Sequence, residues 1–176
     1  PYLNEHPSGI GKPYTVLRKA ACMFGWDWGL SLPDSGIWRD IMIEGYEKGT
    51  IETVIVHQEH MNGKVIVKAQ PVCRGAQDLL FRLTLTEPDG AKLETRECAA
   101  GGTVYFEVEH PRLWWPSGYG GQPLYRLCTE LMTQDMILDT REQRIGLRTI
   151  ELDRSEDGDG AKYSFVINHI PVFCRG

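Results

Sequence analysis

Apolar and polar residues alternate in this chain with a period of two, which is the period of a β-strand rather than a helix. In residues 79–85 every odd position carries leucine or phenylalanine, and Arg82 and Thr84 occupy the other face. Residues 103–109 alternate in the same way, with valine or phenylalanine at each even position. Helical periodicity is nearly absent, so the pattern predicts an all-β protein whose strands each bury one face.

Further segments have the length and composition of strands, and turn residues separate them. These segments are residues 37–46, 51–57, 64–69, 124–131, 136–141 and 163–168. Asn62-Gly63 is a strong signal for a two-residue hairpin, and Pro88-Asp89-Gly90 presets a tight turn. Residues 48–150 thus supply about seven short strands, which is enough for one complete β-sandwich.

The composition changes along the chain. Residues 1–36 are rich in glycine, proline and tryptophan and alternate poorly, which predicts a long loop with little core of its own. Residues 153–160, DRSEDGDG, predict either a domain boundary or a hairpin tip. Residues 163–176 then form a strand-like segment too short to fold alone. We therefore expect the chain to be a piece of a longer protein.

Charge and cysteine content argue against several classes of protein. The net charge is −5 and Arg18-Lys19 is the only adjacent basic pair, which argues against a nucleic-acid partner. No apolar run approaches the roughly 18–20 residues of a membrane span, so no membrane partner is expected. Five cysteines without a CxxC pair indicate reduced thiols and favour a cytoplasmic location over export.

Residues 24–29, FGWDWG, place two tryptophans around one carboxylate, with a glycine on either side. Sugars present apolar C–H patches on their ring faces and hydroxyls at their edges. An aromatic platform beside a carboxylate is therefore typical of a carbohydrate site. The alternative is that Trp26 and Trp28 fill a domain junction while Asp27 caps a turn. The six residues taken alone favour that packing role.

The other conspicuous motifs favour structural roles. Residues 114–120, WWPSGYG, contain turn residues and no acid, which predicts a packed corner before a strand. His57 and His60 would point to opposite faces of a strand, so a metal pair is not expected. The acids of residues 153–159 lack the spacing of a calcium loop, and a solvated turn is expected there.

Catalytic motifs are absent from the sequence, since GxSxG, HExxH, P-loop and GxGxxG patterns do not occur. A glycosidase needs two carboxylates about 5–9 Å apart, and apart from Asp27 no acid has a context that marks it out. The Asn-Glu pair at residues 4–5 lies in a proline-rich loop. His6, His110 and His169 are scattered and are expected to be structural or exposed. We expect no catalytic residue, no metal and no cofactor in this chain.

Taken in order, several motifs resemble glycoside hydrolase family 2. They are RK at 18–19, FGWDWG at 24–29, GIWR at 36–39, WWPSGYGGQPLY at 114–125, RIGLRTIEL at 144–152 and FVINHIPVFCRG at 165–176. The WDW motif is similar to that of the β-mannosidase branch of the family. These landmarks recur along nearly the whole chain.

The resemblance implies an order of domains. Residues 1–47 would be the C-terminal part of a sugar-binding, jelly-roll-like β-sandwich. Residues 48–152 would form an immunoglobulin-like β-sandwich. Residues 153–176 would be a linker and the start of the (β/α)8 catalytic domain. The catalytic glutamates of the family lie on that barrel, and the Asn-Glu pair at residues 4–5 does not correspond to the family's catalytic pair.

The resemblance also implies a site and a function. In β-mannosidases the WDW loop reaches the active site in the barrel and helps to bind the terminal mannosyl unit. Trp26 and Asp27 would contact the substrate here, and Trp28 would support them. The chain is thus expected to be a non-catalytic piece of a retaining exo-β-mannosidase, partnered by a mannoside or oligosaccharide substrate and by its own catalytic barrel. Leu30 replaces the proline that commonly follows WDWG, which makes the loop less rigid.

Two alternatives stay open. The parent could be another family 2 glycosidase, a β-galactosidase or a β-glucuronidase, although the WDW motif argues against both. The chain could also be a stand-alone carbohydrate-binding sandwich, in which case it should bind a sugar without any barrel.

Overall fold

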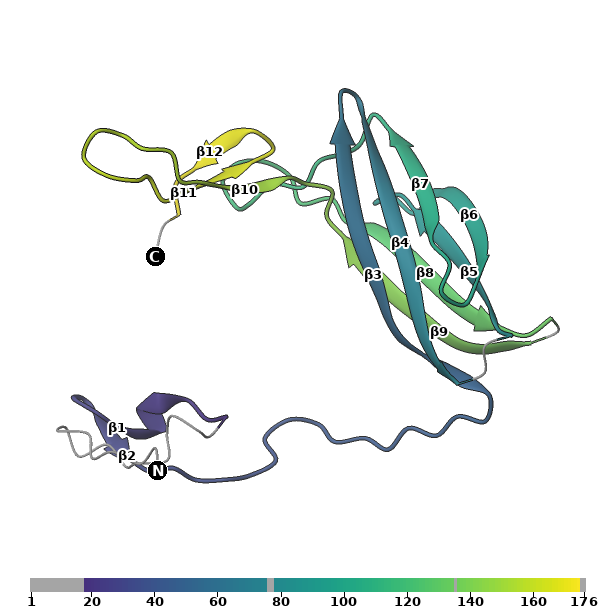
Figure 1. Cartoon of the computed structure of the whole chain (residues 1–176), viewed down its shortest axis with the longest axis horizontal. Coiled ribbons are helices and arrows are strands. Elements are labelled where there is room, and N and C mark those ends of the chain that lie inside the picture. The colour runs from purple at the N-terminus through teal and green to yellow at the C-terminus, as the bar shows by residue number, and fades with distance from the viewer. Residues whose placement is uncertain (1–17, 76–77, 135, 175–176) are drawn as a thin grey trace. The chain divides into compact units, whose positions relative to one another are not determined.

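The computed structural model describes residues 18–75, 78–134 and 136–174, and the chain divides into two compact units, Pro1–Gly45 and Tyr46–Gly176 (Figure 1). Within those ranges the structure is all-β apart from one 3-10 turn, η1 (Ala21–Met23), as the alternation predicted. No helix in the described residues is long and apolar enough to cross a membrane. The Asn-Glu pair at residues 4–5 and His6 lie outside the described residues.

The second unit contains two antiparallel sheets that form a sandwich (Figure 1). One sheet has the order β3 (Gly49–Met61), β4 (Lys64–Gly75), β7 (Val104–Glu109). The other has the order β6 (Lys92–Ala99), β5 (Leu80–Thr86), β8 (Tyr125–Met132), β9 (Ile137–Ile145). This is the immunoglobulin-type arrangement with one difference. The fourth strand of the sandwich, β6, pairs with the third strand, β5, whereas in constant-type domains the fourth strand pairs with the fifth.

The inward-facing positions of both sheets form the core, and they are the positions that the alternation predicted. Phe81, Leu83 and Leu85 of β5 are completely buried, as is Leu127 of β8. The remaining members of the core cluster are Ile51, Val54, Val65, Val67, Ala69, Leu79, Val104, Phe106, Val108, Tyr125, Leu131, Ile145 and Leu147. Because both sheets contribute one apolar face, the sandwich excludes water without a helix.

Both predicted turns are present. Asn62-Gly63 joins β3 to β4 as a two-residue loop, with Met61 paired to Lys64. Gly63 has a φ of 80°, which glycine adopts without the steric cost of a Cβ. At the second turn the Gly90 amide donates to the Glu87 carbonyl oxygen at 2.9 Å, and the chain reverses from β5 into β6.

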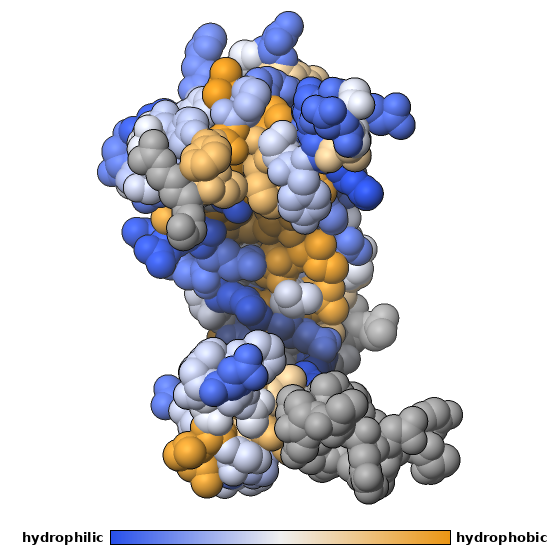
Figure 2. Space-filling view, turned by 90° about the vertical axis from the view of Figure 1, so that its left-hand side faces the viewer, coloured by the Kyte–Doolittle hydropathy of each residue, from blue (hydrophilic) through white to orange (hydrophobic). Residues whose placement is uncertain are grey.

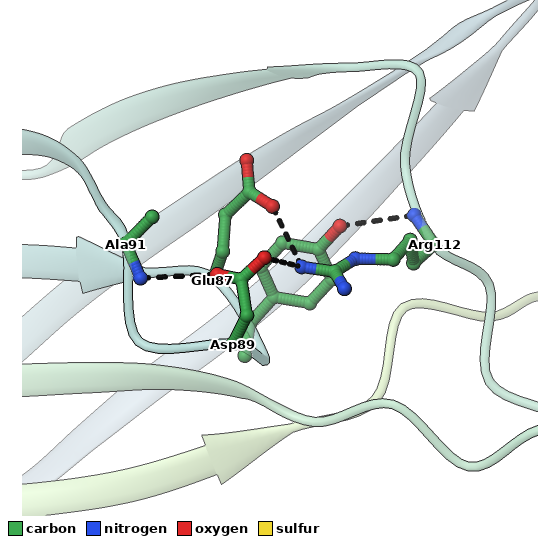
Figure 3. A network of polar contacts seen from close by, with 5 residues as sticks. Glu87, Asp89, Ala91 and Arg112 are labelled. Carbon is green, nitrogen blue, oxygen red and sulfur yellow. Dashed lines mark hydrogen bonds and ion pairs between the residues drawn. The ribbon is translucent and has the colours of Figure 1, made fainter.

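Arg112 connects the β7–β8 segment to the β5–β6 turn by hydrogen bonds (Figure 3). Its guanidinium donates to the carboxylates of Glu87 and Asp89, each at 2.8 Å. Its backbone amide donates at 2.9 Å to the hydroxyl of Tyr125, a buried residue at the start of β8. A buried tyrosine that binds upstream backbone at this strand is a hallmark of immunoglobulin-type sandwiches.

The segment at residues 114–120 forms a packed corner, as predicted. The Trp114 amide donates to the Leu147 carbonyl oxygen at 2.9 Å, which ties the corner to the end of β9. The Arg148 guanidinium lies 4.5 Å from the centre of the Trp114 ring. A Cβ on Gly146 would approach the ring to 2.9 Å, so only glycine fits beneath the indole.

A third, smaller sheet of the second unit follows the sandwich in the chain. It contains β10 (Ile150–Asp153), β11 (Ser164–Ile167) and β12 (Ile170–Val172). Residues 154–163 are the connection between β10 and β11, so the polar DRSEDGDG stretch belongs to a hairpin tip. Asp153 accepts hydrogen bonds from the backbone amide and the hydroxyl of Ser155. The small sheet spans the domain boundary expected after residue 152.

The predicted strand at residues 37–46 is wrong. The structure gives this segment no β-pairing, and Ile37, Ile41 and Ile43 are 77%, 77% and 100% exposed. A strand is defined by hydrogen bonds to a neighbouring strand, and alternation in sequence cannot supply that neighbour. Hydrophobic residues do reach the surface elsewhere, and Figure 2 shows them among hydrophilic residues on the face that it draws.

Candidate functional site

The FGWDWG motif folds as a short hairpin, although a loop was expected. β1 (Phe24–Trp26) pairs with β2 (Gly29–Ser31), and Trp26 lies opposite Gly29. Two further bonds extend the pairing, since the Ser31 hydroxyl donates to the Phe24 carbonyl oxygen at 3.1 Å and Leu32 donates to Met23 at 3.1 Å. Asp27 and Trp28 therefore form the two-residue tip.

Glycine sets the local geometry of this hairpin. Gly25 has a φ of 118°, a backbone conformation that residues with a Cβ rarely adopt. Lys19 donates to the backbone carbonyl oxygen of Asp34, and its Nζ lies 3.7 Å from the Asp34 carboxylate. This contact joins the two ends of the segment that carries the hairpin.

The hairpin presents its functional groups to solvent within its own unit. Phe24 is only 4% exposed, whereas Trp26 is 53% exposed and Trp28 is 82% exposed. Asp27, between the two indoles, is exposed as well. Two accessible indoles around a carboxylate can stack on the apolar face of a sugar and accept hydrogen bonds from its hydroxyls.

The structure brings other sequence candidates together only in part. His57 and His60 lie on β3, whose pairing with β4 runs without interruption from Thr53 to Met61, so they point to opposite faces. Within the described ranges no group of three His, Cys, Asp or Glu residues could hold a metal ion. The five cysteines all lie in those ranges and none forms a disulfide.

Sequence reasoning missed one feature, a pocket of about 490 Å³ in the second unit. His60, His110 and His169 line this pocket although they are far apart in the chain. The Asn168-His169 dipeptide was a possible signal, because asparagine at the first position of a two-residue loop predicts a hairpin. That hairpin places His169 beside the sandwich.

The sheet order and the Tyr125 hydroxyl contact define the second unit as an immunoglobulin-like β-sandwich. Comparison with known families agrees with this fold. The sequence model of Glycosyl hydrolases family 2 matches residues 47–148, and that of the Glycosyl hydrolase 2 galactose-binding domain-like family matches residues 2–39. The chain belongs to glycosyl hydrolase family 2.

Individual relatives agree with this assignment. Beta-mannosidase B from Aspergillus oryzae is 33% identical over 168 residues, which is 92% of this chain and 20% of that protein. The crystal structure of a beta-D-mannosidase from Dictyoglomus thermophilum matches with a TM-score of 0.81 and 30% identity, over 96% of this chain and 22% of that one.

A more distant match shows the fold alone. The β-glucuronidase from Ruminococcus gnavus matches with a TM-score of 0.58 and 20% identity, over 73% of this chain and 20% of that one. The chain thus spans about a fifth of the length of the relatives that it matches.

Proposed function

We propose that the chain is a non-catalytic part of a retaining exo-β-mannosidase, which hydrolyses terminal β-linked mannose. The observation that carries this proposal is the similarity of nearly the whole chain to beta-mannosidases, together with an exposed WDW hairpin. Retention of configuration requires two carboxyl groups about 5 Å apart. In the family those glutamates lie on the barrel, so the present chain contributes scaffold and one substrate-binding loop.

The proposed roles of the hairpin residues follow from the resemblance to β-mannosidases, and all three side chains are exposed. Trp26 at the end of β1 stacks on the mannosyl ring, and Asp27 at the tip accepts hydrogen bonds from two of its hydroxyls. Trp28 supports both residues. The partners of the chain are the glycoside substrate and the catalytic barrel of the same protein.

The proposal includes three domains. Residues 1–47 end a sugar-binding sandwich, residues 48–152 form the immunoglobulin-like sandwich, and residues 153–176 link it to the barrel. Support comes from the division of the structure after Gly45 and from the family match at residues 47–148.

The 176-residue chain should not hydrolyse an aryl β-mannoside. Chromogenic aryl β-mannoside, galactoside and glucuronide are the appropriate substrates, and the chain should release no aglycone above background from any of them. Turnover of the mannoside by the purified chain would contradict the non-catalytic role. The intact parent enzyme should prefer the mannoside, and a preference for galactoside or glucuronide would favour another family 2 glycosidase.

Substitution of Asp27 tests the site in the intact parent. Asp27→Asn should lower kcat/KM for the aryl β-mannoside by about 10- to 100-fold, because hydrogen bonds to a charged group contribute roughly 1.5–3 kcal/mol. Asp40→Asn changes another exposed acid of the same unit and should leave kcat/KM unchanged. If both substitutions lower kcat/KM equally, Asp27 is not part of the substrate-binding site.

Calorimetry distinguishes the proposal from a stand-alone binding module. A hairpin that supplies only half of a site should bind mannose or mannobiose too weakly to detect. Millimolar or tighter binding by the 176-residue chain would favour a carbohydrate-binding sandwich.

A further inference from the structure

The pocket at His60, His110 and His169 in the second unit combines hydrogen-bonding side chains with apolar ones. It lies among the tip of the β3–β4 hairpin, the start of the β7–β8 connection and the β11–β12 turn. Its lining includes three imidazoles, two asparagine amides and one lysine, and no aspartate or glutamate of the described residues lines it. It provides no aromatic platform and no carboxylate for sugar hydroxyls, which separates it from the WDW hairpin.

The backbone holds these donors in conformations that carry a cost. His110, Asn168 and His169 have φ values of 48°, 48° and 65°, and they are the non-glycine residues with positive φ in the described ranges. All three line this pocket. Left-handed backbone is unfavourable for an ordinary residue with a Cβ, and such strain concentrates at functional sites. Asparagine tolerates it well, but histidine replaces the glycine that usually follows asparagine in a two-residue loop.

Fixed contacts position the β11–β12 turn beside the sandwich. The Asn168 side chain donates to the Trp114 carbonyl oxygen at 3.0 Å and accepts from the Thr149 amide at 3.0 Å. The His60 ring is anchored from the other side, since its Nε2 lies 3.1 Å from Gln58 Oε1. The pocket is therefore built from elements that the fold locks together, not from a free loop.

Charged groups of the pocket lining lie beside carboxylates at its edge. Lys64 donates to Glu107 at 2.7 Å, and His169 Nδ1 lies 3.7 Å from the Glu151 carboxylate. Burial and the charge of the neighbouring His169 lower the pKa of His60, whereas a hydrogen bond with the Arg148 backbone raises it. An anion near both rings would offset the repulsion between them.

We propose that this pocket is a binding site for an oxyanion, a phosphate, sulfate or carboxylate group, held by the imidazoles of His110 and His169 beside the ring of His60. His60 donates its Nε2–H to Gln58 Oε1, so the N–H groups of His110 and His169 supply the direct hydrogen bonds to the ligand. This site is independent of the proposed mannosidase function, because it does not involve the WDW hairpin.

Proton NMR of the histidine rings tests the site in the 176-residue chain, titrated with inorganic phosphate at constant ionic strength. The ring signals of His60, His110 and His169 should shift saturably as phosphate is added at pH 6. His57 on the opposite face of β3 is an internal control and should not shift. A hexose phosphate that binds more tightly than phosphate would identify a phosphate group on a sugar as the source. Equal affinities would identify the free anion.

Substitution of His169 separates binding from folding. His169→Gly should weaken phosphate binding by about tenfold, the equivalent of one charge-assisted hydrogen bond. It should not lower the melting temperature, because glycine is the preferred residue at this turn position. His57→Gln should bind phosphate like the unmodified chain. The proposal is overturned if sodium chloride reproduces the shifts, if His57 shifts equally, or if His169→Gly binds phosphate with unchanged affinity.

Discussion

At the scale of single residues, His60 shows how the fold alters the chemistry of a side chain. The histidine is half-buried at the end of β3, and its ring lies within hydrogen-bond distance of Gln58. Gln58 in turn donates to the Gly146 carbonyl oxygen at 3.1 Å and accepts from the Arg148 amide at 3.1 Å. Protonation of His60 therefore affects the hydrogen bonds of Gln58 that join β3 to the end of β9.

The lowered pKa of His60 predicts a loss of stability in acid. Because the pKa of His60 in the folded chain lies below the ordinary histidine value of 6.5, the unfolded chain binds the proton more readily. The contribution of neutral His60 to the free energy of unfolding is complete above pH 6.5. It is lost as the pH falls through the pKa that His60 has in the folded chain. The melting temperature should decline from pH 7 to pH 5 in a buffer without oxyanions. His60→Gln should flatten this dependence, whereas the exposed His57→Gln should retain it. An unchanged slope in His60→Gln would contradict this assignment.

At the scale of elements, side chains of β9 close one open edge of the sandwich against β3. Asp139 accepts from the Thr50 hydroxyl at 2.7 Å and from the Ile51 amide at 2.8 Å. Arg141 donates to the Glu52 carbonyl oxygen at 2.8 Å. Alternate residues of β9 thus bond to backbone groups of β3 that have no partner within their own sheet. These bonds protect the β3 edge from pairing with another chain.

Removal of Asp139 should destabilise this edge. Asp139→Ala leaves the Ile51 amide without its acceptor, and we expect a loss of about 2 kcal/mol in the free energy of unfolding, measured by urea denaturation at pH 7. Glu142→Ala on the same strand removes only an exposed ion pair with Arg126 and should cost less than about 0.5 kcal/mol. Similar losses in both variants would show that the edge contacts contribute little.

The same carboxylate gives this element a pH dependence. Burial raises the pKa of Asp139, but hydrogen bonds from Thr50, Ile51 and Thr140 and the charge of Arg141 outweigh it and lower the pKa. Its contribution is therefore present above the unfolded pKa, about 3.9, and is lost as the pH falls through the lower folded value. The difference between Asp139→Ala and the unmodified chain should shrink below pH 4.

Element patterns also show what the sequence could and could not predict. Inward faces such as those of β5 and β7 were predictable because burial on one face forces alternation. The outer strand β6, KLETRECA, was missed because few of its side chains are buried and no apolar face marks it. The segment at 37–46 alternates but lacks a neighbour, and the pocket histidines meet only through tertiary packing. Local pattern determines which residues are apolar, but not which strands pair.

At the scale of the whole molecule, the two units differ in how they are stabilised. Every member of the core cluster belongs to the second unit. In the described part of the first unit, Phe24 is the buried hydrophobic residue, and the hairpin around it has only three residues in each strand. A two-stranded hairpin is marginally stable by itself, whereas a two-sheet sandwich carries its own core.

A chain shortened to residues 46–176 should therefore fold without the first unit. We expect cooperative thermal unfolding with a midpoint within about 4 °C of the full chain, because a larger shift would require more than roughly 1 kcal/mol of lost contacts. A chain of residues 62–176 lacks β3 and should not fold, since it loses Ile51 and Val54 from the core. If the 46–176 chain is unfolded, the sandwich needs the first unit. If it folds as expected, a substitution at Trp26 or Asp27 changes activity through the hairpin and not through the sandwich.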